Sequence, residues 1–140
     1  MEIFDFLPIF ELILINYKTN NMSNIIRTGI IGFGASGRVF HAPFVNVVDG
    51  LELTKVSTSN PVNIQIANER YPNTKVVNTP QEIIEDPNID LVIVTSPNTD
   101  HFRWSKEGLL ANKHVMVEKP FTVTVEEADE LVALAKKQNK

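Results

Sequence analysis

The sequence contains no cysteine among its 140 residues. That absence excludes disulfide bonds, thiolate metal ligands and a cysteine nucleophile together, and it fits the reducing conditions of the cytoplasm. Basic residues are also outnumbered, with 13 Lys and Arg against 17 Asp and Glu and a formal net charge of -4. This balance gives no electrostatic attraction to nucleic acid or to an anionic membrane. We therefore expect a cytoplasmic globular protein of about one domain.

The first 21 residues differ in character from the rest of the chain. Met1–Ile15 is rich in Ile, Leu and Phe, but it also contains three acidic residues and a proline. It has neither the basic start nor the small-residue cleavage site of a signal peptide, and it is too short and too acidic for a membrane span. We favour an N-terminal extension or a mispredicted start over the alternative, an amphipathic segment that packs on a partner. The domain proper is expected at residues 22–140.

Beyond this extension, strand-like and helix-like stretches alternate. Runs of β-branched and apolar residues predict strands, and they cover residues 25–31, 51–57, 75–77, 91–95 and 114–117. Apolar residues at helical spacing predict helices, which cover residues 35–48, 62–70, 99–112 and 125–138, with one short turn at 81–85. Strict alternation of this kind predicts an α/β fold, a doubly wound parallel sheet with helices on both faces.

Two of the predicted helices have features of their own. In the first, Val39, Ala42 and Val47 are the apolar positions, and Pro43 is expected to bend or restart the helix. In the third, residues 99–112, Phe102, Leu109 and Leu110 are expected to share one side.

A glycine-rich motif directly follows the first predicted strand. Its sequence is Gly32-Phe33-Gly34-Ala35-Ser36-Gly37. A G-x-G-x-x-G motif between a strand and a helix is the fingerprint of a Rossmann dinucleotide-binding domain. Gly32 would permit the tight turn, Gly34 would let the backbone approach a pyrophosphate, and Gly37 would let the helix pack close to the sheet. The alternative is a turn that serves packing only.

The choice between NAD and NADP depends on the end of the second strand. An acidic residue about 20 positions beyond the last glycine would bind the ribose 2′-hydroxyl of NAD. The sequence there is Ser57-Thr58-Ser59-Asn60, without a carboxylate. Hydroxyl and amide groups can donate to the 2′-phosphate of NADP, so we favour NADP over NAD. Arg38 could point toward the pyrophosphate or away from it, and the same cluster could also form a turn that caps the next helix.

A second polar segment follows the fourth strand, at the edge where open α/β sheets bind ligands. Its sequence is Thr95-Ser96-Pro97-Asn98-Thr99-Asp100-His101. Pro97 would end the strand, and Asn98 or Thr99 could cap the helix that carries His101. At this position a functional and a structural role for His101 are both open. His114, at the start of the fifth strand, is expected to be a structural or surface residue.

The fifth strand ends in Glu118-Lys119-Pro120. The order of a glycine loop, Ser-Pro-Asn before a histidine-bearing helix, and Glu-Lys-Pro after strand five resembles the Gfo/Idh/MocA family of oxidoreductases, which includes glucose–fructose oxidoreductase and inositol dehydrogenase. The resemblance covers the chain from Ile25 to its C-terminus. The stretches Gly37–Pro43 and Asp86–Asp90 are similar to a branch that contains NADP-dependent scyllo-inositol dehydrogenases.

The resemblance implies hydride transfer between a nicotinamide and a hydroxyl-bearing carbon of a sugar or cyclitol. Lys119 matches the catalytic lysine of the family, and Glu118 would contact the nicotinamide ribose. Asn98 and His101 would line the cofactor cleft. Together with the motifs above, the expected cofactor-binding residues are Gly32, Phe33, Gly34, Ala35, Ser36, Gly37, Arg38, Ser57, Thr58, Ser59, Ser96, Pro97, Asn98, His101 and Glu118.

Members of the family continue into a further strand and a substrate domain, which supplies an aspartate and a histidine beside the lysine. We expect this chain to be a fragment that lacks that C-terminal domain and has little or no turnover alone. A small polyol, sugar or cyclitol substrate and a homo-oligomer are expected of the full-length form. The alternative function is a catalytically dead dinucleotide-binding or sensing module, which can arise when a Rossmann domain loses its catalytic half.

Overall fold

The computed structural model of the chain describes residues 25–140, so the predicted extension at residues 1–21 lies outside the described residues. The strands are β1 (Ile26–Ile31), β2 (Leu51–Ser57), β3 (Lys75–Val77), β4 (Leu91–Val94) and β5 (His114–Val117). The helices are η2 (Gly37–His41), α2 (Ala42–Val47), α3 (Pro61–Arg70), α4 (Gln81–Ile84), α5 (Asn98–Leu110) and α6 (Val125–Gln138). All the predicted elements are present.

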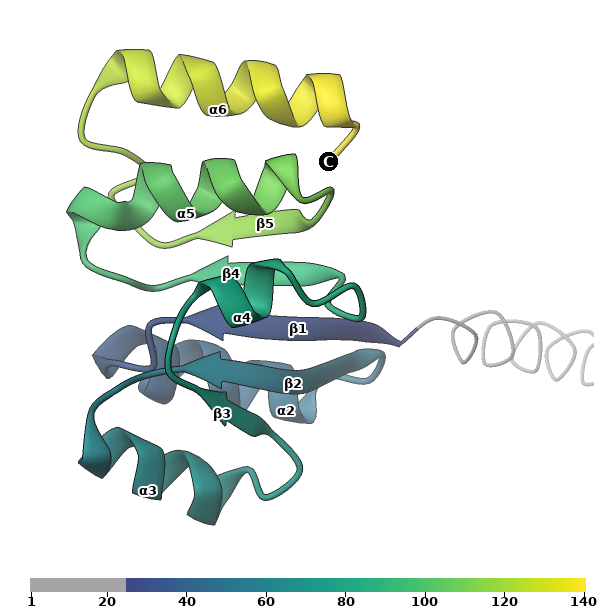
Figure 1. Cartoon of the computed structure of the whole chain (residues 1–140), viewed down its shortest axis with the longest axis vertical. Coiled ribbons are helices and arrows are strands. Elements are labelled where there is room, and N and C mark those ends of the chain that lie inside the picture. Colours follow the sequence, from purple (N-terminus) through teal and green to yellow (C-terminus); the bar gives the residue numbers. More distant parts are fainter. Residues whose placement is uncertain (1–24) are drawn as a thin grey trace, which may run out of the picture.

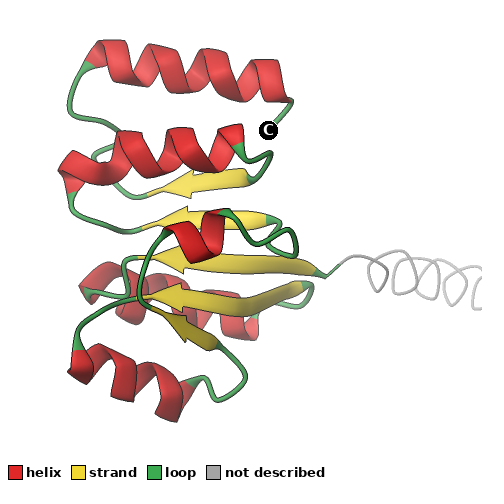
Figure 2. Cartoon of the chain, in the orientation of Figure 1, coloured by secondary structure: helices red, strands yellow, loops and turns green. Residues whose placement is uncertain are grey.

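The strands form one parallel sheet in the order β3-β2-β1-β4-β5. Helices cover both of its faces, with α2 behind the sheet and α4 and α5 in front of it in the view of Figure 1. The alternation of strand and helix along the chain is plain in Figure 2. The predicted doubly wound α/β architecture is therefore confirmed.

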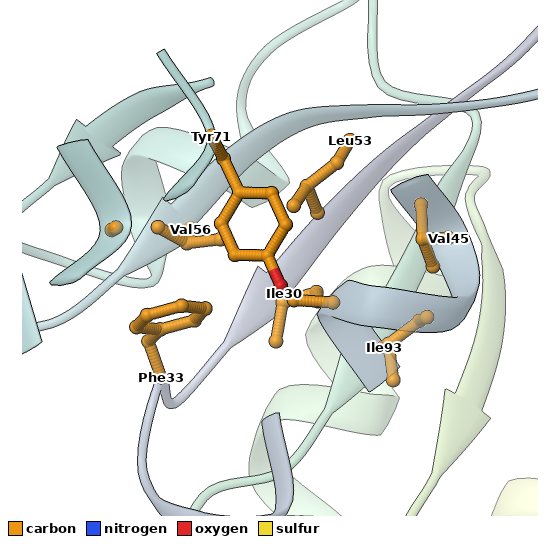
Figure 3. Close-up of a cluster of buried hydrophobic side chains, with 9 residues drawn as sticks. Ile30, Phe33, Val45, Leu53, Val56, Tyr71 and Ile93 are labelled. Carbon is orange, nitrogen blue, oxygen red and sulfur yellow. The ribbon is translucent and has the colours of Figure 1, made fainter. Parts of the chain in front are cut away.

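The hydrophobic core is divided by the sheet into two clusters. On the face of α2 and α3, Ile30 and Ile93 pack with Phe33, Val45 and Tyr71 (Figure 3). On the opposite face, the neighbouring strand residues pack against α4 and α5; the cluster is made up of Ile31, Val77, Ile83, Ile84, Ile89, Val92, Val94 and Trp104. Successive residues of β1 and β4 thus enter opposite clusters, as expected for central strands buried on both faces.

The first predicted helix is two different helices. Residues 37–41 form a π-helix, η2, in which the backbone N–H of Ala42 donates to Gly37 O. Ordinary α-helical bonding begins at α2, with Pro43 in its first turn. Proline is tolerated there because the first N–H groups of a helix have no partner within it. The expectation that Pro43 restarts the helix is confirmed.

Two predicted helix faces were wrong in part. In η2 and α2, Val39 and Val47 are 55% and 73% exposed, while Ala42 is buried. In α5, Leu109 is buried but Leu110 is 57% exposed. The buried stripe of α5 instead consists of His101, Trp104, Ser105, Gly108 and Leu109.

The C-terminal helix α6 lies against α5 at one end of the molecule (Figure 1). It begins with a capping box, in which the Thr124 side chain accepts from Glu127 N and the Glu127 carboxylate reaches back. Leu131 is its buried contact, and an ion pair of 2.6 Å joins Lys106 Nζ to Glu130 Oε1. Within residues 25–140, no helix has the length and apolar character needed to cross a membrane.

Candidate cofactor site

The candidate site lies at the carboxyl edge of the sheet, where the strand order reverses. Connections from β1 and β4 lead to opposite faces of the sheet, and these two strands are neighbours. Open α/β sheets bind ligands in the crevice outside such a switch point. The glycine loop follows β1, the polar segment that begins at Thr95 follows β4, and Glu118 and Lys119 follow β5. The topology therefore places the predicted segments at one edge.

The first and last glycines of the motif are required by the backbone itself. Gly32 has a φ of +93°, and a Cβ there would lie 2.8 Å from Thr95 O. A Cβ on Gly37 would lie 2.5 Å from Gly32 O and 2.8 Å from Thr95 Oγ1. No side chain fits at either position without a backbone shift. The roles predicted for Gly32 in the turn and for Gly37 in close packing are confirmed.

Gly34 differs from both. It is exposed, and a Cβ built on it would meet no atom within 4 Å among the described residues. Packing therefore does not require glycine at this position. Two residues further on, Ser36 Oγ is buried without a hydrogen-bond partner in the described part of the chain. An open approach to the backbone beside a hydroxyl that needs a partner fits a bound pyrophosphate, so the loop is suited to a dinucleotide.

Side chains from the two neighbouring strands hold the turn at Gly32. Ser57 Oγ, at the end of β2, accepts from Gly32 N at 3.3 Å. Thr95 Oγ1, just after β4, donates to Gly32 O. Ser57 is only 4% exposed, so its side chain supports the glycine loop from inside the protein and is not accessible to a ligand. The expectation that Ser57 contacts the ribose is corrected, because its hydroxyl is directed at the loop.

Phe33 needs the same kind of correction. Its ring is 1% exposed and meets Tyr71 edge to face, with ring centroids 6.2 Å apart (Figure 3). Its backbone N–H donates to Ser57 O at 3.0 Å. Both groups are therefore used inside the protein, and Phe33 anchors the loop to the core.

The polar cluster after β2 serves in part as a helix cap. Asn60 Oδ1 accepts from Val62 N at 2.9 Å and from Asn63 N at 3.3 Å, so the predicted capping turn is confirmed. Ser59 is exposed beside it. Thr58 is half-buried, and its hydroxyl accepts from Asn60 N.

Arg38 forms a hydrogen bond with a residue of α3. Its Nη1 donates to Asn63 Oδ1 at 3.3 Å, so the guanidinium extends from the glycine loop to the start of α3. The same Asn63 donates its backbone N–H to Asn60 Oδ1, so Arg38 and the cluster after β2 share a partner at the start of α3. Asn63 was missed by sequence reasoning, since nothing in its position along α3 marks it as a partner of Arg38.

The segment after β4 begins α5 without a side-chain cap. The N-cap residue is Pro97, and neither Asn98 nor Thr99 caps the helix. The expected cap was wrong because the helix starts one residue earlier, which places Asn98 in the first turn. Pro97 and Asn98 are exposed, and Ser96 is half-buried. Asn98 is therefore accessible to solvent at the carboxyl edge of the sheet.

His101 is buried, with 1% of its surface exposed. Its Nδ1 lies 2.8 Å from Pro120 O, and its Nε2 lies 2.9 Å from Ser96 O. The ring thus joins the segment after β4 to the segment after β5. The expectation that His101 lines the cofactor cleft is corrected, because both ring nitrogens are used within the protein and the structural alternative describes it.

At the end of β5, Glu118 lies against His41 of η2. Glu118 Oε1 and His41 Nε2 are 2.7 Å apart, and Glu118 Oε2 accepts from Lys119 N at 3.0 Å. The hydrogen bond with His41 is the largest cause that lowers the pKa of the Glu118 carboxyl, so Glu118 is ionised at neutral pH. Lys119 is exposed. The corner therefore combines a carboxylate with a lysine that solvent, or a ligand, can reach.

The sheet order, the glycine loop and the lysine at the carboxyl edge together define a dinucleotide-binding domain of the Rossmann class. Residues 26–140 match the GFO_IDH_MocA oxidoreductase family, which has an NAD-binding Rossmann fold. The chain belongs to this family, as the motifs predicted.

Named relatives agree with this assignment. The chain is 44% identical to the uncharacterized oxidoreductase YdgJ of Escherichia coli over 82% of its own length and 32% of that protein. It is 39% identical to the scyllo-inositol 2-dehydrogenase (NADP(+)) IolW of Bacillus subtilis, over 81% of the chain and 31% of that protein. The crystal structure of a putative oxidoreductase from Bacteroides fragilis superimposes with a TM-score of 0.78 at 44% identity, covering 83% of this chain and 35% of that one. The chain thus spans about a third of the length of the relatives it matches.

Proposed function

We propose that this domain binds NADP(H) and forms the nucleotide-binding part of an oxidoreductase that acts on a hydroxyl-bearing carbon of a sugar or cyclitol. The observation that carries the proposal is the open glycine loop at the same sheet edge as Lys119. When bound, the nicotinamide would supply or accept the hydride. Gly34 and Ser36 would hold the pyrophosphate, and Lys119 would exchange a proton with the substrate hydroxyl.

Two features support NADP over NAD. No carboxylate stands at the end of β2, so nothing there would repel a 2′-phosphate. In addition, Arg38 donates to Asn63 in the first turn of α3, the helix that the polar cluster after β2 caps, and so brings a cation to that end of α3. A guanidinium with adjacent hydroxyl donors suits a phosphate group, because charge-assisted hydrogen bonds are stronger than neutral ones. The relative IolW carries NADP(+) in its name.

Titration of the purified chain with NADPH and NADH, at one fixed salt concentration, tests this proposal. We expect tighter binding of NADPH. Thr58→Asp should weaken NADPH binding at least tenfold and affect NADH less, because the new carboxylate would repel the 2′-phosphate. Asn73→Asp is the matched control, since it adds the same charge at an exposed position in the loop before β3. Equal affinity for the two cofactors in the unmodified chain contradicts the NADP assignment.

A further inference from the structure

His41 is the last residue of the short π-helix η2, which begins at Gly37, the last glycine of the loop. A π-helical turn holds more residues per turn than an α-helix, and such turns occur frequently at functional sites. Here the turn brings His41 against Glu118, which lies 77 positions further along the chain. The two side chains are 18% and 22% exposed, so the contact is largely shielded from water.

The Glu118 carboxylate connects His41 to Lys119. One oxygen faces the ring nitrogen of His41, and the other accepts from the backbone N–H of Lys119. Each carboxylate oxygen has two acceptor sites, so Glu118 can hold both partners and still accept from a ligand hydroxyl. A carboxylate held at both oxygens has little freedom to rotate. His41 therefore supplies a side-chain contact that helps to fix its direction.

We infer that His41 is a positioning residue: it holds the Glu118 carboxylate, and Glu118 in turn holds the backbone from which the Lys119 side chain projects. The inference rests on the proposed function, because that function assigns Lys119 to the reaction at the cofactor site. It extends that function, since the proposal itself gives His41 no part. A hydrogen bond between a ring nitrogen and an ionised carboxylate is among the stronger bonds in proteins.

Cofactor binding provides the first test. His41→Phe keeps the size of the ring but removes the donor, and we expect it to weaken NADPH binding about tenfold, as for one hydrogen bond to a charged group. His41→Gln can still donate to Glu118 and should restore most of the affinity. His114→Phe, an exposed histidine at the opposite end of β5, is the matched control and should bind as the unmodified chain does. Thermal unfolding of each variant verifies the fold.

A spectroscopic measurement tests the same link without a cofactor. In NMR titrations the backbone amide of Lys119 should report the ionisation of Glu118, since the two are hydrogen-bonded. Removal of His41 should raise the midpoint of that titration toward the value of an ordinary glutamate, because His41 is the main cause that lowers it. Glu118→Gln should abolish the titration at this amide.

The outcomes separate the two proposals. If the unmodified chain binds no NADPH, the proposed function fails, while the NMR titration still tests the contact between His41 and Glu118. An unchanged midpoint in His41→Phe overturns the inference. So does normal NADPH binding by a folded His41→Phe, or equally weak binding by folded His41→Gln and His41→Phe variants, since a positioning hydrogen bond should be rescued by the donor.

Discussion

Two glycines of the same loop should respond in opposite ways to the same substitution. In Gly37→Ala the new Cβ would lie 2.5 Å from Gly32 O and 2.8 Å from Thr95 Oγ1, well inside van der Waals contact. The first of these atoms is backbone, so the start of η2 must move away from the turn. Overpacking of this kind costs about 1–3 kcal/mol. We expect Gly37→Ala to lower the free energy of unfolding by that amount.

In Gly34→Ala the new Cβ would meet nothing within 4 Å. Gly34 is also not among the glycines with positive φ, so alanine can adopt its backbone conformation. Replacing glycine under these conditions stabilises a protein by about 0.4–1 kcal/mol, because the unfolded chain loses conformational freedom. The added methyl group would, however, occupy the space that we assign to the pyrophosphate. NADPH affinity should therefore fall at least tenfold while the free energy of unfolding stays constant or rises, and the bulkier Gly34→Val should abolish binding.

Urea unfolding followed by far-UV circular dichroism measures the first quantity, and NADPH fluorescence measures the second. The pair is its own control, since both variants add one methyl group to the same loop. The assignment of Gly34 to the phosphate site is refuted if Gly34→Ala binds NADPH as the unmodified chain does. The packing argument for Gly37 is refuted if Gly37→Ala unfolds at the same urea concentration as the unmodified chain.

The remaining predictions concern acid stability and turnover. Lys55 Nζ lies 2.5 Å from Asp86 Oδ2, and this hydrogen bond is the largest cause that lowers the pKa of Asp86 below 3.8. A carboxyl group whose pKa is lower in the folded than in the unfolded chain stabilises the fold at pH values above its pKa in the unfolded chain. This stabilisation is lost as the pH falls through its pKa in the folded chain. Asp86→Asn should thus lower stability at neutral pH by about 1–3 kcal/mol and flatten its acid dependence, in urea unfolding at several pH values. In an assay that follows nicotinamide absorbance, we expect no useful turnover of polyols or sugars by the chain alone. Positioning of the substrate carbon accounts for about 7–11 kcal/mol of barrier lowering, and in the family the substrate domain supplies residues beside the lysine. Turnover that disappears in Lys119→Ala would contradict this prediction.

The fold was accessible from the sequence because its signals are local and consistent. Runs such as Leu91–Val94 are apolar throughout, which indicates a strand buried on both faces, and β4 is such a strand. The glycine motif also stands between a strand and a helix, so its context supports its interpretation. Neither signal depends on knowing which distant residues meet.

The contact of His41 with Glu118 was not accessible in this way. Sequence periodicity assumes about 3.6 residues per turn, and the π-helix at 37–41 breaks that assumption. The spacing of about 3.6 residues per turn therefore does not hold for η2, and Val39, which that spacing placed with Ala42, is exposed. Pro43 marks where α-helical bonding resumes, but it does not indicate what precedes it.

The placement of His101 could have been improved from the sequence alone. Residues 101, 104, 105, 108 and 109 follow the i, i+3, i+4, i+7, i+8 spacing of a buried helix face, and all five are buried in α5. This stripe contains polar and small residues besides Trp104 and Leu109, so a search for apolar residues chose Phe102 and Leu110 instead. A histidine at the start of such a stripe points toward the sheet, where backbone carbonyls at the strand ends need donors. The same argument applies to Ser57, which ends β2. Its buried side chain supports the glycine loop, whereas the exposed polar side chains at this edge are the candidates for ligand contact.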